Sequence, residues 1–316
     1  MVALCSRDAT RARAAADEAG VPGAYGDWRE LVTDPAVQLV AVATPPSEHA
    51  GPVLAAFAAS KAVLCEKPLA ATLEDATALD AAAAGRTAAI SFGYRALPAF
   101  VAARAAAADG AIGHVVSVDV SWHLGTRLTL PPGTGWKDDA STGGGALASY
   151  GIHMLDYACL LLGPAQRVCC LLKNRTRDGH VSDDACEILL DHAGGGRSTL
   201  DISLVSTGER RHRVVVNGER GRIVIESTRC DDHVRGFVAR LEATGATPRE
   251  LPLRASPWPA PASLDGRVEP VAAIAAALLQ LPGAASEAPS FADGLTAQRL
   301  LAAARTSAVS ASWTAP

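Results

Sequence analysis

The segment A-V-L-C-E-K-P-L, residues 62–69, sets four apolar residues directly before a charged pair and a proline. Such a short apolar run, without polar alternation, is typical of a parallel strand buried on both faces of a sheet. Similar runs occur upstream and downstream, and alanine-rich segments with helical character separate them. The expected strands are residues 2–5, 38–43, 62–65 and 87–93, and the expected helices are residues 9–19, 28–33, 49–59 and 72–84.

This alternation indicates parallel strands joined by right-handed crossovers, as in a doubly wound α/β domain. Polar residues that cap helix N-termini precede each helical segment. The expected caps are Asp8 or Thr10, Asp27, Ser47, and Thr72 with Asp75. We therefore expect residues 1–110 to form an α/β domain.

The pattern changes after about residue 110, where strands with polar alternation begin. They are expected at residues 114–122, 166–173, 184–191, 197–206, 211–217 and 222–226, and Gly218-Glu219-Arg220-Gly221 is typical of a hairpin turn. Helices are expected at residues 98–108, 145–162 and 292–309, and a surface loop at 251–266. Residues 111–316 are thus predicted to form an α+β domain with an open, largely antiparallel sheet.

The length, charge and apolar content of the chain disfavour several classes of protein. With 316 residues the chain is about two domains long. A net charge of −4 disfavours nucleic acid as a partner, and no apolar run has the length of a membrane helix. The N-terminus lacks the pattern of a secretory leader, so the cytoplasm is the expected location. The seven cysteines lack metal-type spacing and are expected to be reduced and mostly buried.

Ligands of doubly wound sheets lie outside the carboxyl ends of the strands. Three consecutive strands are followed there by polar or proline-rich segments: Cys5 to Asp8, Ala43 to His49, and Cys65 to Pro68. Taken alone, Glu66-Lys67-Pro68 is more typical of a surface ion pair before a turn than of a binding site. Its place after a buried strand favours a binding site.

A second group of polar residues lies on the predicted helix 145–162. Ser149, His153 and Asp156 have the spacing i, i+4, i+7, so they share one helix face. The glycine run 143–145 precedes this helix and allows close approach to a ligand. His153 could instead be a core histidine, and Asp156 a structural residue.

The ordered motifs resemble the Gfo/Idh/MocA family of NAD(P)-dependent oxidoreductases. The resemblance extends over the whole chain and rests on A-T-P-P-S-E-H (43–49), C-E-K-P-L (65–69), G-Y-R-A-L-P (93–98), G-A-I-G-H-V (110–115), G-G-G-A-L-A-S-Y-G-I-H-M-L-D (143–156) and the closing helix. It implies a Rossmann-like doubly wound domain, incomplete at its N-terminus, and a substrate-binding and oligomerisation domain that supports a homodimer or homotetramer.

The resemblance also implies residue functions. Lys67 would be the catalytic lysine, because a partly desolvated lysine beside a nicotinamide can relay a proton to or from a substrate oxygen. His153, with an ordinary pKa near 6.5, would be the acid or base that contacts the substrate. Cofactor contacts would come from Ala43, Thr44, Pro45, His49, Glu66 and Lys67. The implied reaction interconverts a secondary alcohol and a ketone on a sugar, inositol or sugar-like molecule.

The chain departs from the family pattern in two places. Ser149 stands where the dehydrogenases of the family usually carry an aspartate, and a serine hydroxyl cannot accept a proton as a carboxylate does. The acidic function could have moved to Asp138, Asp139 or Asp183. Ser6 and Arg7 stand where NAD-preferring members carry an acid, so we expect NADP, with NAD possible, because arginine binds phosphate strongly.

The glycine pattern G-x-G-x-x-G is absent, and the first strand of the chain corresponds to the second strand of the family fold. We therefore expect the first strand, its glycine turn and the first helix to be missing from this sequence, and Met1 to be an internal position of a longer protein. The alternative is a non-catalytic pseudoenzyme or oligomerising ligand-binding protein that has lost nucleotide binding. The substrate loop is expected at residues 123–142, with Trp122, Arg127, Trp136 and Lys137.

Overall fold

The structure is a computed structural model that describes residues 1–129, 136–139, 144–174, 182–208, 210–227, 229, 234–259, 264–281 and 288–316. Of the side chains within these ranges, those of Arg127, Thr129 and Trp136 are not described. In the described part of the chain, every helix falls short of the length or the apolar content that crossing a membrane requires.

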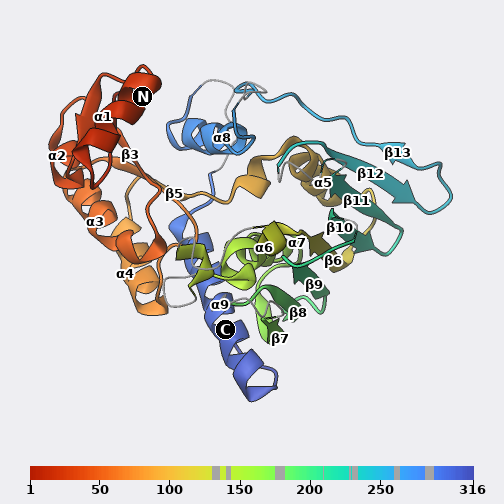
Figure 1. Ribbon diagram of the computed structural model, residues 1–316. Coiled ribbons are helices and arrows are strands. Elements are labelled where there is room, and N and C mark those ends of the chain that lie inside the picture. The colour runs from red at the N-terminus through yellow and green to blue at the C-terminus, as the bar shows by residue number, and fades with distance from the viewer. Residues whose placement is uncertain are drawn as a thin grey trace.

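The first half of the chain is built from parallel strands and helices, as predicted (Figure 1). Its elements are β1 (Ala3–Cys5), α1 (Ala9–Glu18), β2 (Gly23–Tyr25), α2 (Trp28–Thr33), β3 (Leu39–Val42), η1 (Pro46–Glu48), α3 (Ala50–Ala58), β4 (Ala62–Cys65), α4 (Leu73–Ala83) and β5 (Ala88–Ile90). The strands form two separate parallel sheets, one of β1 and β2 and one of β3, β4 and β5.

Three of the predicted helix caps are confirmed. The side chains of Asp8, Asp27 and Thr72 accept hydrogen bonds from backbone N–H groups at the starts of α1, α2 and α4. The cap predicted at Ser47 is wrong, because Pro46 starts the 3-10 turn η1 and α3 begins only after His49. Proline has no N–H to be satisfied and suits the first position of a helical turn.

The second half of the chain forms one eight-stranded sheet in the order β13-β12-β11-β10-β6-β9-β8-β7. Within this sheet, as far as the structure describes it, β6 and β9 are the only neighbours that pair in parallel. The elements are η2 (Gly93–Ala96), α5 (Pro98–Ala108), β6 (Val115–His123), α6 (Thr126–Thr129), η3 (Trp136–Asp138), η5 (Leu147–Gly151), α7 (Ile152–Leu162), β7 (Ala165–Lys173), β8 (Ala185–His192), β9 (Arg197–Ser203), β10 (Arg211–Gly218), β11 (Gly221–Ser227), β12 (Phe237–Ala243), β13 (Arg249–Glu250), α8 (Val268–Leu278) and α9 (Phe291–Ser310). The predicted largely antiparallel sheet and the hairpin between β10 and β11 are confirmed.

Helices cover this sheet and join the two halves of the chain. Val118, Val120 and Trp122 of β6 point to the buried face, where α5 and α7 pack. The long helix α9 contacts α4 and β5 of the first half as well as α7 and β7 of the second (Figure 1). One hydrophobic core therefore runs through both halves and includes residues from β3, α7 and α9.

Candidate active site

The carboxyl ends of β3 and β4 lie side by side, since Val42 pairs with Cys65 and Glu66 N–H donates to the Val42 carbonyl over 2.9 Å. Ala43 and Thr44, directly after β3, are exposed. Pro45 and Glu66 are half-buried. These residues are therefore accessible at the sheet edge where a doubly wound sheet binds its ligand. Their position fits a dinucleotide cofactor.

The end of β1 gathers a hydroxyl and two guanidinium groups. Ser6 Oγ accepts hydrogen bonds from Arg11 Nε (3.2 Å) and Nη2 (3.0 Å). Arg7 and Arg11 are both exposed. The carboxylate of Asp8 caps α1 by accepting from Arg11 N–H. The exposed guanidinium groups of Arg7 and Arg11 could bind a phosphate, whereas the N-terminus of α1 is already capped by the Asp8 carboxylate. Sequence reasoning missed Arg11, although its place in the first turn of the predicted helix 9–19, close to Ser6 and Arg7 in the sequence, was a signal.

His49 does not contact the surface where a cofactor would bind, contrary to the expectation. Its ring is completely buried, with Nε2 2.9 Å from the Thr44 carbonyl and Nδ1 3.1 Å from the Leu69 carbonyl. It thus links the loop after β3 to the segment that carries Lys67. His49 follows Thr44 by five residues, and its imidazole packs against the loop after β3 that contains Thr44. His49 therefore supports the site rather than binding the cofactor.

Lys67 reaches across to the helix of the second half. Its Nζ donates to the Ser149 carbonyl over 2.6 Å. Burial lowers the pKa of Lys67 to about 8, Glu66 opposes this effect, and the nearby charges of Lys137 and Arg267 add to it. A lysine with such a pKa exchanges a proton readily near neutral pH. Arg267 directly precedes α8 and was missed by sequence reasoning, because nothing local links residues 200 positions apart.

His153 lies beside this lysine. Its pKa falls well below 6.5, because the ring is buried and because Lys67 and His212 add positive charge. The imidazole is therefore neutral at pH 7, which corrects the expectation of a pKa near 6.5. Tyr94 and Phe92 pack edge-on against the ring, with centroid distances of 5.1 and 6.2 Å. Its Nδ1 has no hydrogen-bond partner among the described residues.

Ser149 lies in the π-helical turn η5, directly before α7. Its Oγ is buried and also has no hydrogen-bond partner in the described part of the chain. The structure thus brings together Lys67, Ser149 and His153, as the resemblance implied. A buried hydroxyl without a partner beside a lysine suits a substrate that carries hydroxyl groups, because a buried polar atom without a partner is costly.

Of the three acids proposed to replace the family aspartate, Asp183 holds the start of η5. Its carboxylate accepts from Leu147 N–H over 2.8 Å, and its carbonyl accepts from Ala146 N–H. Asp139 accepts from Gly144 N–H through its backbone carbonyl, and Asp138 is buried. Asp183 therefore holds the backbone at the start of η5 in place and does not take the place of Ser149.

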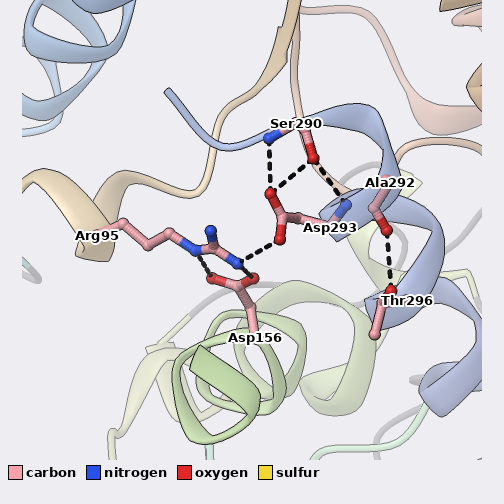
Figure 2. Close-up of polar contacts among 6 residues, drawn as sticks. All are labelled: Arg95, Asp156, Ser290, Ala292, Asp293 and Thr296. Carbon is pink, nitrogen blue, oxygen red and sulfur yellow. Dashed lines mark hydrogen bonds and ion pairs between the residues drawn. The ribbon is translucent and has the colours of Figure 1, made fainter. Parts of the chain in front are cut away.

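Asp156 is a structural residue in this chain. It forms a two-pronged ion pair with Arg95, which also contacts Asp293 (Figure 2). Burial raises the pKa of Asp156 to about 6, although Arg95 opposes the shift. These charges line a pocket of about 270 Å³ between α7 and α9.

The predicted substrate loop is only partly described. The side chains of Arg127 and Trp136 lie outside the described residues. Trp122 is buried and stacks on His212 at 3.9 Å, so it anchors the core. Among the described residues no three His, Cys, Asp or Glu side chains are grouped to hold a metal ion.

Two family models match the chain. Residues 1–94 match the model described as the oxidoreductase family with an NAD-binding Rossmann fold, and residues 100–224 match the GFO/IDH/MocA C-terminal domain. The chain belongs to the Gfo/Idh/MocA family. As a Gfo/Idh/MocA protein it is a nicotinamide-dependent oxidoreductase.

Several relatives of this Gfo/Idh/MocA chain are named for oxidoreduction. An uncharacterized oxidoreductase of Synechocystis is 27% identical and aligns with 95% of this chain and 85% of its own length. D-apiose dehydrogenase of Paraburkholderia graminis is 32% identical, over 82% of this chain and 69% of its own. Trans-1,2-dihydrobenzene-1,2-diol dehydrogenase of Sus scrofa is 29% identical, over 70% of this chain and 64% of its own.

Among solved Gfo/Idh/MocA structures, levoglucosan dehydrogenase in complex with NADH and levoglucosan is 25% identical to this chain and superposes with a TM-score of 0.84. The match covers 99% of this chain and 89% of that structure.

Proposed function

We propose that the chain is an NADP(H)-dependent oxidoreductase that interconverts a secondary alcohol and a ketone on a sugar, inositol or sugar-like small molecule. The observation that carries the proposal is the Lys67 Nζ contact with the Ser149 carbonyl beside the neutral His153. It is supported by relatives named as D-apiose and dihydrodiol dehydrogenases and by the levoglucosan complex.

In this proposal the substrate hydroxyl lies among Lys67, Ser149 and His153. A neutral lysine has two N–H groups and a lone pair, so Lys67 can keep its bond to the Ser149 carbonyl while the lone pair receives the hydroxyl proton. His153, neutral at pH 7, accepts a hydrogen bond from the substrate at Nε2 and shares in the proton transfer. Ser149 Oγ binds the substrate as donor or acceptor, in place of the charged family aspartate. A nicotinamide held beside Glu66 and Lys67 would supply the hydride acceptor for alcohol oxidation and the hydride donor for ketone reduction.

We infer that the preferred cofactor is NADP, because Ser6, Arg7 and Arg11 surround the place where a 2′-phosphate would lie. NAD stays the alternative, since the levoglucosan complex holds NADH. Fluorescence titration with NADPH and NADH decides between them: at least tenfold tighter binding of NADPH is expected. Equal affinities, or binding of NADH alone, would contradict the NADP assignment.

The catalytic proposal is tested with levoglucosan, D-apiose and trans-1,2-dihydrobenzene-1,2-diol as substrates, by following absorbance of the reduced nicotinamide. Lys67→Met is expected to lower kcat by about 100-fold or more, the usual contribution of a proton-transferring group. The matched control is Lys173→Met, which removes an exposed lysine from β7. Turnover that is the same in both variants would overturn the assignment.

The pH profile gives a second readout. Since the pKa of Lys67 is about 8, the lysine becomes neutral as the pH rises through that value. Alcohol oxidation needs the neutral form and should speed up through pH 8, whereas ketone reduction needs the ammonium form and should slow down. A rate that does not change between pH 7 and 9 in both directions would contradict this function of Lys67.

We also propose a division into domains near residue 110, a cytoplasmic location and assembly into a homodimer or homotetramer. The sheet face opposite α5 and α7 supports assembly, because Leu171 and Leu189 are exposed there among charged residues. Sedimentation of wild type and of Leu189→Asp checks it: the variant should dissociate, and a monomeric wild type would contradict the proposal.

A further inference from the structure

Arg95, Asp156 and Asp293 form a buried charged cluster that the proposed reaction does not use (Figure 2). Arg95 Nε donates to Asp156 Oδ2 over 2.8 Å, and Nη2 donates to Asp156 Oδ1 over 2.5 Å and to Asp293 Oδ1 over 3.0 Å. The side chains of Arg95 and Asp156 are only 15% and 4% exposed. The three residues belong to η2, α7 and α9, so the cluster joins three elements.

The geometry of the cluster fixes orientation as well as distance. A guanidinium that binds both oxygens of one carboxylate holds the two groups in a common plane, which a single hydrogen bond does not. Asp293 also accepts from the Ser290 N–H and Oγ–H and so completes the capping box of α9. η2 is thereby tied to α7 on one side and to the start of α9 on the other.

η2 carries the aromatic side chain that touches the site. Tyr94, next to Arg95, packs edge-on against the His153 ring, and Phe92, which precedes η2, packs on the same ring. η2 is a 3-10 turn of four residues without a side-chain cap. Hydrogen bonds of such turns have poor geometry, so contacts with other elements keep the turn in place.

His153 depends on these neighbours. A catalytic histidine is usually oriented by a hydrogen bond to its second ring nitrogen. His153 Nδ1 has no such partner among the described residues. Asp156, one helical turn further along α7, binds Arg95 instead. Ring packing by Tyr94 and Phe92 therefore sets the orientation of the imidazole. The contacts that keep η2 in place thereby also keep the His153 ring in place.

We propose that Arg95 and Asp156 are positioning residues: their ion pair holds η2 against α7, so that Tyr94 and Phe92 keep the His153 ring in the orientation that meets the substrate. The catalytic consequence rests on the proposed function above, but the ring orientation does not. The experiment therefore needs a readout of the ring itself.

The ring is followed by ¹⁵N NMR of the imidazole in the full chain, with the His153 signals assigned by their loss in His153→Gln. Asp156→Asn and Arg95→Met are expected to shift or broaden these signals, to lower kcat at least tenfold and to leave the Kd of NADPH within twofold. The matched control is Asp191→Asn, which removes a surface ion-pair partner of Arg167 and Arg197 and should change none of these readouts.

A double variant separates positioning from stability. Arg95→Met with Asp156→Leu removes both charges, and apolar replacement of a buried ion pair restores stability that a single deletion loses. The melting temperature should therefore recover relative to the single variants, while kcat stays low because the apolar pair lacks the two-pronged geometry.

Two results would overturn the proposal: His153 signals that are the same in wild type and both single variants, or a kcat that recovers together with the melting temperature in the double variant. If the wild-type chain oxidises none of the three test alcohols but its His153 signals still depend on Arg95, the positioning stands and the proposed function fails.

Discussion

His49 shows how one buried ring can organise two loops. Both of its nitrogens face backbone carbonyls, those of Thr44 and Leu69, but a neutral imidazole has only one N–H to donate. The Cys65 thiol lies 3.3 Å from Nδ1, and burial raises the pKa of that thiol, so it stays protonated and able to donate. A ring proton on Nε2 makes the shorter of the two carbonyl contacts, that with Thr44 at 2.9 Å, and leaves Nδ1 to accept from this thiol.

Replacing this ring should loosen the loop after β3. His49→Ala leaves the Thr44 carbonyl without its donor and opens a cavity, so we expect a loss of about 2 kcal/mol or more in the free energy of unfolding. Binding of NADPH should weaken as well, because Thr44 and Pro45 lose their support. Urea denaturation and fluorescence titration check both. His114→Ala, at an exposed histidine, is the control, and equal effects of the two variants would contradict this view of His49.

The candidate site residues were easier to predict from the sequence than the residues that pack around them. The spacing of Ser149 and His153 placed both on one helix face, and the family resemblance added Lys67, whose Nζ contacts the Ser149 carbonyl. The ion pair of Asp156 was not predictable, because Arg95 lies 61 positions away and its η2 turn has no sequence period. The neutral state of His153 likewise depends on burial and on His212, which only the tertiary fold brings near.

Among the predicted helices, the one over residues 145–162 departs most from its prediction. The sequence indicated a continuous α-helix over residues 145–162, but residues 147–151 form a π-helical turn. Such turns are frequent at functional sites. Gly145 begins the approach to it with a φ of +105°, and a Cβ atom there would lie 2.2 Å from Asp183 Oδ1. Glycine is therefore required for the bond between Asp183 and Leu147.

Gly145→Ala tests whether this glycine is needed at the start of η5. The added methyl group would push the Asp183 carboxylate off Leu147 N–H, so we expect a loss of more than 2 kcal/mol in unfolding free energy and a lower kcat. Gly110→Ala is the matched control: Gly110 also has a positive φ, +76°, but open space around its Cβ position. It should cost only about 1 kcal/mol and leave kcat unchanged. Equal losses would show that backbone strain alone matters at Gly145.

Most other elements follow their predictions within a few residues, because their apolar runs or alternation are strong. The exceptions have identifiable causes. β2 is three residues long and begins with Gly23, so it carries no periodic signal. α8 follows a segment rich in Pro, Ala and Ser that was predicted as a loop, although a proline in the first turn of a helix, as Pro270 is here, is tolerated. In contrast, F-V-A-R-L-E-A of β12 alternates with period two and could have been predicted from the sequence alone.

For the whole molecule, the division of the parallel strands into two sheets has a consequence for local stability. β1 pairs only with β2 among the described residues, whereas β3, β4 and β5 share one sheet within the large core. Two-stranded sheets are marginally stable by themselves. We expect backbone amides of β1 and β2 to exchange with deuterium at least tenfold faster than those of β4, and NADPH to slow them. Equal exchange of both sheets would contradict this expectation.

The helix α9 has a consequence for how the chain folds while it is being made. It contacts β5 and α4, which leave the ribosome about two hundred residues earlier, yet it is synthesised after every other helix and strand that the structure describes. Until α9 emerges, the side of the first half that it covers stays open to solvent and to other chains. The N-terminal half therefore completes its core only after nearly the entire chain has been translated, so a nascent chain stalled before residue 291 is exposed to chaperones and proteases.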